Sequence, residues 1–429
     1  MADADALDLL AFIDASPSPY HAAEEAARRL EAAGFRRLDE TAAWRSLPGG
    51  HVVVRGGSLV AWATGEMASP QEGFHLIGAH TDSPNLRIKP RPDTASAGWR
   101  QLGVEVYGGA LRNSWLDHDL GLSGRVAVRD GDATTQTRLF RVDDPLLRVP
   151  QLAIHLDRGV NDGLVLNPQQ HLTPVWGLGG PDPGGFARFL AEQVGCSPGD
   201  VLGWDVMAHD VTPGRVLGRD EELLSVARID NLLSCWAAVQ ALIEAADAGA
   251  GGSGPSPVIC LFDHEEVGSE SATGAGSALL ATVLERVAAT LDGGREDFHR
   301  GLAQSVCLSA DGAHATHPNY PERHEPGHHI AVNAGPVIKH NANVRYATDA
   351  TTAATFVLAC ERAGVPYQEF VVRSDLPCGS TIGPITAARL GIPTVDVGVA
   401  QLSMHSAREL CGAADPGLFR RALTAFLTA

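Results

Sequence analysis

The sequence predicts an α/β fold, namely a mixed, mostly parallel sheet flanked by helices, with an inserted β-rich domain. From residue 231 onward, short apolar runs alternate with longer helical patterns, and another apolar run stands early, at 74–79. Such alternation is typical of parallel strands joined by helices that cover both faces of a sheet. Residues 91–220, in contrast, show short, turn-bounded strand patterns. We therefore expect residues 1–90 and 221–429 to form one domain, into which 91–220 is inserted.

The individual elements follow from periodicity and from the positions of glycine and proline. Gly34 is expected to cap the first helix. The predicted helices span 20–33, 184–194, 231–248, 279–291, 351–363 and 416–427. The predicted strands span 52–54 and 59–62, joined as a hairpin through Gly56 and Gly57, and then 74–79, 104–107, 125–128, 137–142, 257–262, 305–309 and 393–399.

Composition narrows the class of protein. The 429 residues carry 33 basic and 51 acidic side chains, a net charge of −18, which disfavours nucleic acid or an anionic membrane as the partner. Lysine occurs only as Lys89 and Lys339. No apolar run reaches the ~18 residues that span a bilayer, and the acidic N-terminal stretch does not look like a signal peptide. Seven scattered cysteines suit free thiols in a reducing compartment, so we expect a cytoplasmic protein.

Residues that bind metals recur where the predicted strands end. In open α/β sheets, ligands bind beyond the carboxyl ends of the strands, so side chains distant in sequence can meet there. Each signal is weak alone, but their recurrence at separate junctions makes a specific set. The set comprises His80 and Asp82 after 74–79, Glu265 and Glu266 after 257–262, Asp311 after 305–309, His405 after 393–399, and Asp230 just before the helix at 231.

The chemistry of this set suits two divalent ions. Zinc accepts imidazole nitrogen and carboxylate oxygen, and hydrolytic sites leave a position open for water. A carboxylate that bridges two ions offsets their repulsion, and the pair lowers the pKa of a shared water towards neutrality. Positions i and i+2 of an extended segment point the same way, so Asp82 can hold the far nitrogen of His80. The adjacent Glu265 and Glu266 point in different directions, so one can bind metal while the other transfers protons.

Each residue would have an ordinary structural role if it stood alone. The HTD loop at 80–82 would be a turn with a capping aspartate, and a Glu–Glu pair is usually a solvated face. Asp230 would be a helix N-cap, Asp311 a turn residue before glycine, and His405 a satisfied loop histidine. Their joint occurrence at strand ends favours the metal centre.

Nine segments, spread over nearly the whole chain, form one specific pattern. They are GAHTDSPNLRIKP (78–90), NSWLDHDL (113–120), LAIHLDR (152–158), ARIDNLLS (227–234), FDHEEVGS (262–269), SADGAHATHPNY (309–320), GPVIKHN (335–341), SDLPCGSTIGP (374–384) and QLSMHSARE (401–409). At these residues the chain resembles the aspartyl aminopeptidase family of dinuclear zinc exopeptidases. The resemblance implies a zinc exopeptidase-like catalytic domain in two parts, 1–90 and 221–429, with 91–220 as an inserted dimerisation or lid domain.

The resemblance also implies a division of the metal ligands between two zinc ions. His80 and Asp311 would hold one ion, Glu266 and His405 the other, and Asp230 would bridge them. Two further residues would assist. Asp82 would orient His80, and Glu265 would be the general base and proton shuttle.

Substrate contacts are implied as well. They fall on His155, His314, Lys339 and Tyr346, together with Glu265 and Asp311. His155 would reach into the active site of a neighbouring subunit and stabilise the developing oxyanion. Dimers would then build a homo-oligomer, expected to be a dodecamer, which admits peptides and excludes folded proteins.

Without the resemblance, these extra positions would be assigned structural roles. His155 lies in the alternating run LAIHL, where a strand histidine is usually structural. Tyr346 would be a packing residue, and Lys339 a surface charge. The rarity of lysine and the apolar run before Lys339 favour pairing between its ammonium and an acidic substrate side chain.

The expected activity is removal of N-terminal Asp or Glu from peptides by water that two zinc ions activate, with a glutamate as general base. Mn²⁺ or Co²⁺ could take the same ligands. Two alternatives share this chemistry, a broad-specificity metal-dependent aminopeptidase and a deacylase. A third is a catalytically silent binding or scaffold protein, which the intact set of ligands disfavours. Vacuolar delivery is an alternative to the cytoplasm.

Overall fold

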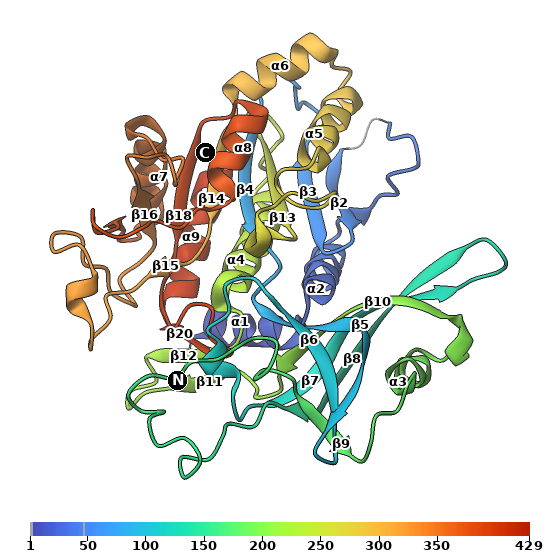
Figure 1. Cartoon of the computed structure of the whole chain (residues 1–429). Helices are drawn as coiled ribbons and strands as arrows, with labels where there is room; N and C mark the ends of the chain where they lie inside the picture. The colour runs from blue at the N-terminus through green and yellow to red at the C-terminus, as the bar shows by residue number, and fades with distance from the viewer. Residues whose placement is uncertain (1–2, 46–47) are drawn as a thin grey trace.

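A mixed sheet with helices on both faces forms the larger part of the molecule (Figure 1). The computed structural model describes residues 3–45 and 48–429. Within these ranges the sheet has nine strands in the order β1-β2-β3-β13-β4-β14-β18-β16-β17. Five neighbouring pairs are parallel and three antiparallel, so the prediction of a mixed, mostly parallel sheet is confirmed.

Apolar runs build the centre of this sheet. The strands β3 and β13 are buried along their whole length, as expected for strands covered on both faces. The predicted hairpin through Gly56 and Gly57 joins β2 to β3. The strands are β1 (Arg36–Arg37), β2 (Gly49–Arg55), β3 (Ser58–Thr64), β4 (Phe74–His80), β13 (Ser256–Phe262), β14 (Val306–Ala310), β16 (Val337–His340), β17 (Gln368–Val371) and β18 (Thr394–Gly398).

Helices cover the two faces in separate groups. One hydrophobic cluster contains Phe12, Trp236, Phe356 and Phe419, so the helices that carry them pack on the same face. The other cluster holds residues of a second group, including Phe298. The first group is α1 (Ala4–Ala15), α2 (Pro19–Ala32), α4 (Ile229–Asp247), α7 (Ala350–Ala363) and α9 (Asp415–Leu427), and the second is α5 (Leu279–Thr290), α6 (Arg295–Gln304) and α8 (Ile382–Leu390).

A closed β-barrel lies beside the sheet domain, in the lower part of Figure 1. Its strand order is β10-β5-β6-β9-β8-β7. The predicted boundary at 90/91 falls inside β5, so the barrel begins at Asn85. Its elements are β5 (Asn85–Ser96), β6 (Trp99–Tyr107), β7 (Asp119–Arg129), β8 (Thr135–Arg148), β9 (Val175–Leu178), α3 (Gly185–Val194) and β10 (Val201–Asp210).

A third, small sheet connects the two larger parts, and the sequence did not indicate it. Its strands are β11 (Arg215–Leu217), β12 (Leu223–Val226), β15 (Ala313–His314), β19 (Ala400–Leu402) and β20 (Glu409–Gly412). Short 3-10 turns complete the chain at η1 (Arg112–Trp115), η2 (Pro198–Asp200), η3 (Glu265–Val267) and η4 (Pro321–Arg323).

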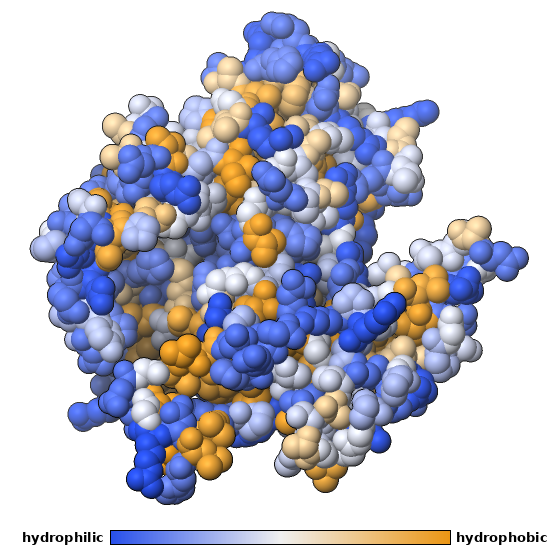
Figure 2. Space-filling view, in the orientation of Figure 1, coloured by the Kyte–Doolittle hydropathy of each residue, from blue (hydrophilic) through white to orange (hydrophobic). Residues whose placement is uncertain are grey.

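The loop between β8 and β9 corrects one prediction. Residues 154–156 form a turn and not a strand. The alternating pattern LAIHL does not form a paired strand here. The segment instead leaves large apolar side chains in solvent. Leu156 is 75% exposed and Val165 is 85% exposed. Figure 2 shows apolar surface over the lower part of this face, where Figure 1 draws the loop.

Two general expectations concern the helices and the thiols. None of the helices in the described ranges is long and apolar enough to cross a bilayer. All seven cysteines are unpaired, and five of them are buried. Buried thiols of this kind act as small hydrophobic side chains.

Candidate metal centre

The site lies where three neighbouring parallel strands end. β4 pairs with β13 on one side and with β14 on the other, so their carboxyl ends reach the same edge of the sheet. His80 is the last residue of β4 and stands opposite Phe262, the last residue of β13. Glu265 and Glu266 follow in the short turn η3, and Asp311 follows β14. The predicted convergence at strand ends is therefore present.

Asp230 lies between the two candidate histidine ligands. Its Oδ1 is 3.3 Å from Nε2 of His80, and its Oδ2 is 3.4 Å from Nε2 of His405. The same His80 nitrogen is 3.5 Å from Asp311 Oδ1, and the same His405 nitrogen is 3.3 Å from Glu266 Oε1. Each histidine thus faces Asp230 and one further carboxylate, which is the pairing expected for two ions with Asp230 between them.

The other nitrogen of each histidine ring contacts a backbone carbonyl. Nδ1 of His80 is 2.9 Å from the carbonyl oxygen of Asp82, and Nδ1 of His405 is 3.2 Å from that of Gly109. A carbonyl oxygen only accepts hydrogen bonds, so each Nδ1 carries a proton and Nε2 is the nitrogen that a metal would bind in place of a proton. This is the tautomer that binds a metal through Nε2.

The oxygen atoms that face these nitrogens also fit a metal. Asp230 Oδ1 and Glu266 Oε1 are buried and lack a hydrogen-bond partner, although an Nε2 atom lies 3.3 Å from each. Ligand atoms around a tetrahedral zinc ion with bonds of about 2.0 Å are about 3.3 Å apart. One ligand atom each from His80, Asp230 and Glu266 lies within 4.8 Å of the others. The residues present therefore suit zinc in both ligand type and spacing.

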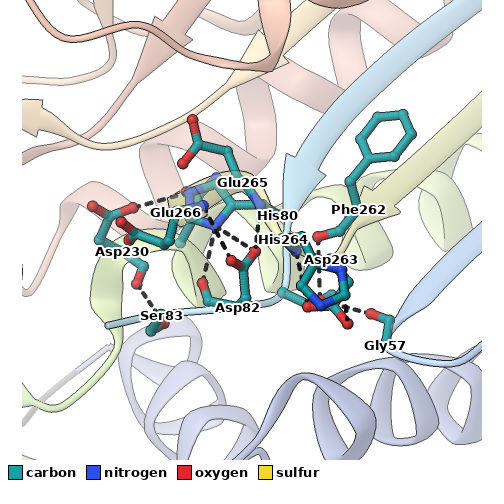
Figure 3. Close-up of polar contacts among 12 residues, drawn as sticks. Gly57, His80, Asp82, Ser83, Asp230, Phe262, Asp263, His264, Glu265 and Glu266 are labelled. Atoms are coloured by element: carbon teal, nitrogen blue, oxygen red, sulfur yellow. Dashed lines mark hydrogen bonds and ion pairs between the residues drawn. The ribbon is translucent and has the colours of Figure 1, made fainter. Parts of the chain in front are cut away.

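Asp82 does more than the sequence predicted. Its side chain is fully buried, and its oxygens accept hydrogen bonds from the backbone N–H groups of Glu265 and Glu266, at 3.0 Å and 3.1 Å. The predicted contact with His80 is made mainly by the backbone carbonyl, since the carboxylate lies 3.5 Å from Nδ1. Figure 3 shows Asp82 below His80 and the two glutamates. Asp82 therefore orients the histidine and the two glutamates together.

Glu409 is a site residue that the sequence did not indicate. It lies in β20 and is buried. One carboxylate oxygen accepts the backbone N–H of Asp230 at 3.0 Å, and the other accepts that of His405 at 2.8 Å. It thereby fixes the backbone of two candidate ligands. The only signal was an acidic residue four positions after His405, and nothing in that spacing indicates burial.

Crowded carboxylates shift the ionisation of the site. Burial raises the pKa of Glu265 to about 8, against the opposing charge of His80 and together with repulsion from Asp311 and Glu266. Burial and the charge of Asp230 likewise raise the pKa of Glu266 to about 7. The opposite holds for His405, where burial lowers the pKa but the carboxylates around it raise it to about 11. Several negative charges in one buried site favour a bound cation.

A cavity of about 350 Å³ opens in front of these residues. Every candidate site residue lines it except Asp82 and His155. The Glu265 side chain points away from Asp82 in Figure 3 and makes no interaction there. At the far wall Lys339 is buried and not a surface charge. Its Nζ donates to the carbonyl of Gly312 at 3.1 Å and lies 3.7 Å from Asp311 Oδ2.

Of the remaining substrate-contact candidates, Tyr346 and His314 line the cavity and His155 does not. Tyr346 is buried, and the Lys339 ammonium lies 5.0 Å from the centre of its ring. The His314 side chain is exposed to solvent within the cavity. The protein atoms around it, by partial desolvation, and then the charge of Lys339 lower its pKa. His155 is exposed in the loop between β8 and β9 and does not line this cavity. A single chain therefore does not bring His155 to the site.

The pKa values predict how a metal-free preparation responds to pH. Glu265 and Glu266 have raised pKa values, as does His405, so the folded state holds more protons than the unfolded state near neutrality. Stability from such groups is present below their unfolded pKa values and is lost as pH rises from those values to the folded ones. We expect the thermal midpoint of the metal-free protein to fall between about pH 5 and about pH 8, and zinc to reduce this fall because a cation replaces the protons. Equal slopes with and without zinc, in a calorimetric pH series, would contradict the expectation.

Comparisons with known proteins identify the family of this chain. The family profile described as "Aminopeptidase I zinc metalloprotease (M18)" matches residues 12–427. The "Probable M18 family aminopeptidase 2" of Streptomyces coelicolor is 57% identical over 98% of this chain and 96% of its own length. The protein of the same name from Mycobacterium tuberculosis is 54% identical, over 99% of this chain and 98% of its own.

Solved structures show the same fold. A chain in the cryo-EM structure of the Ape4 and Nbr1 complex matches 99% of this chain, and 85% of its own length is covered, with a TM-score of 0.94 and 37% identity. The structure of the S. cerevisiae mApe1 dodecamer matches with a TM-score of 0.86 and 28% identity, over 98% of this chain and 95% of that one. The sequence match and the fold together show that this chain belongs to the M18 family of zinc aminopeptidases.

Proposed function

We propose that this aminopeptidase binds two zinc ions and removes N-terminal Asp or Glu from peptides. The observation that most supports two ions is the position of Asp230, whose two oxygens face different histidines. One ion would be held by His80 and Asp311 and the other by Glu266 and His405. Mn²⁺ or Co²⁺ would fit the same ligands. Zinc content of the purified protein, measured by mass spectrometry, tests the count, and one ion per chain or none would contradict it.

The residues of the chain divide the work of peptide hydrolysis. Bound zinc ions supply a Lewis acid that polarises the scissile carbonyl and lowers the pKa of a water molecule. Glu265 accepts the proton of the attacking water and returns it to the leaving amine. Asp82 holds the backbone of Glu265 in place. His155 of the partner subunit donates to the oxygen on which negative charge develops.

Lys339 would provide the preference for an acidic first residue. Its ammonium is the only lysine charge at the cavity, and it stands in a protein with a net charge of −18. A buried ammonium facing a cavity attracts a carboxylate more strongly than one in open solvent does. His314 and Tyr346 flank Lys339 in the cavity wall and would complete the pocket for that side chain.

Replacing Lys339 with methionine tests the specificity, because methionine keeps much of the apolar stem and removes the charge. Removing one partner of a buried charge pair costs about 2 kcal/mol or more, so kcat/KM for an Asp-initiated peptide should fall at least about 30-fold relative to a Leu-initiated one. The ratio of the two substrates cancels any loss common to both, such as disturbance of Asp311. The matched control is Lys89→Met, since Lys89 does not line the cavity and its ammonium bonds Gln169 in the loop between β8 and β9.

One observation favours the alternative of broad specificity. Lys339 already donates to Gly312 and lies near Asp311, so its charge has partners within the chain. An equal loss on both peptides would assign Lys339 a structural role and support a broad-specificity enzyme. Profiling peptides with free and blocked amines separates an aminopeptidase from a deacylase.

The apolar loop supports assembly. The loop between β8 and β9 exposes four large apolar side chains, those of Leu152, Ile154, Leu156 and Val165. Clusters of exposed apolar side chains mark protein interfaces. Burial of this loop against a second copy would form the dimer, and dimers would form a dodecamer like that of mApe1. The unpaired cysteines suit a reducing compartment, so we place the enzyme in the cytoplasm.

A further inference from the structure

We propose that the inserted barrel is a part of the metal centre, because its residues 107–111 hold the metal ligands in position. The inference rests on the proposed two-metal site and concerns the residues that surround it. The segment leaves the end of β6 and passes over the site, where it bonds Asp82 and His405 and lies close to Glu266.

Tyr107 makes the first of these contacts. Its hydroxyl donates to Oδ2 of Asp82 at 2.6 Å, and both side chains are buried. The guanidinium of Arg87, also in the barrel, lies 3.9 Å from the centre of the Tyr107 ring. Asp82 in turn accepts the backbone N–H groups of Glu265 and Glu266. Tyr107 therefore fixes the carboxylate on which the orientation of both glutamates depends.

The next two residues approach the ligands closely. A Cβ atom on Gly108 would lie 3.1 Å from Cβ of Glu266, and one on Gly109 would lie 3.0 Å from Nδ1 of His405. Contacts this short are tighter than ordinary van der Waals contacts, so a side chain on either residue would have to displace the ligand beside it by a few tenths of an ångström. Gly108 also has a φ of +70°, which favours glycine. The glycines let the backbone of the barrel lie directly against two ligands.

Backbone groups of the segment bind His405 from two sides. The Gly109 carbonyl accepts the Nδ1 proton of His405, and the backbone N–H of Leu111 donates to the His405 carbonyl at 3.0 Å. The first contact sets the ring tautomer and the second holds the main chain. Groups that orient metal ligands in this way are worth about 10- to 100-fold in metal affinity when they are removed.

Zinc affinity of Tyr107→Phe tests the proposal. The change removes only the hydroxyl and leaves the ring under Arg87. We expect a zinc affinity about 10- to 100-fold weaker, measured by competition with a chromophoric chelator on folded protein, and a modest fall in the melting temperature of the metal-free protein because a buried hydrogen bond is lost. Tyr20→Phe is the matched control, because Tyr20 is also buried and lies under an arginine, Arg125, at 4.3 Å, and no ligand contact is lost.

A second pair of variants tests the backbone contact. Gly109→Ala should weaken zinc binding by pushing His405 aside, whereas Gly103→Ala, in the same strand as Tyr107, places its Cβ no closer than 3.6 Å to any neighbour and should bind zinc like the unmodified protein. Excess zinc should restore turnover of Tyr107→Phe.

Three outcomes distinguish the possibilities. Wild-type zinc affinity in both Tyr107→Phe and Gly109→Ala would overturn the role of the segment while leaving the two-metal site intact. A lowered melting temperature of the metal-free variants with unchanged zinc affinity would assign the segment a purely structural role. Failure of the unmodified protein to bind zinc would instead refute the proposed function itself.

Discussion

Glu265→Gln is expected to lower kcat about 100- to 10,000-fold, the range attributed to general acid–base catalysis. Glutamine has nearly the same shape but cannot take a proton from water at neutral pH. The Glu265 side chain lines the cavity, and in Figure 3 its carboxylate contacts none of the other residues drawn, so the change should leave those contacts intact. Burial, with repulsion from nearby carboxylates, raises its pKa to about 8, and bound cations would lower that value.

The experiment needs metal content beside turnover, because a lost metal would also abolish activity. Zinc stoichiometry should stay unchanged in Glu265→Gln, since the expected ligands are other residues. Glu270→Gln is a suitable control, because Glu270 is exposed in the same segment between β13 and α5 and does not line the cavity. Near-normal turnover of Glu265→Gln at full zinc occupancy would exclude Glu265 as the base.

Local sequence patterns predicted the central strands and most helices of the α/β part, because the apolar residues that bury each of these elements recur within its own segment. The run FHLIGA forms β4 and the run PVICLF forms β13. A short continuous apolar run is typical of a strand that helices cover on both faces of the sheet. The helices α1, α6 and α8, the strands β16 and β17 and the small sheet were not predicted. These strands are all two to four residues long, and partners far away in the chain determine strands of this length.

The same reasoning explains which site residues could be predicted. His80 and Asp311 stand at strand ends, where parallel topology brings them together. Glu409 and Tyr107 lie inside a strand or at its end in segments without any metal-ligand spacing. They contact the ligands through a backbone N–H or through Asp82, and a sequence pattern does not encode such contacts.

His155 gives the second large effect, because its proposed role lies in another subunit. His155→Ala should lower kcat about 100- to 1,000-fold, as removal of an oxyanion donor does, and leave zinc binding unchanged. The neighbouring exposed His171, in the same loop, serves as the control in His171→Ala. Activity close to normal in His155→Ala would remove this residue from the mechanism.

Mixed oligomers test whether the histidine acts across the interface. In a two-fold symmetric dimer each loop would serve the opposite site, so a subunit with His155→Ala keeps a working Glu265 and can borrow His155 from a Glu265→Gln partner. Random mixing of these two inactive subunits should restore about one quarter of the sites, since half keep Glu265 and half of those face an intact His155. If His155 acted within its own chain, no mixed pair would contain a complete site, and the mixture would stay as inactive as its components. The exposed position of His155 in the single chain makes recovery the expected result.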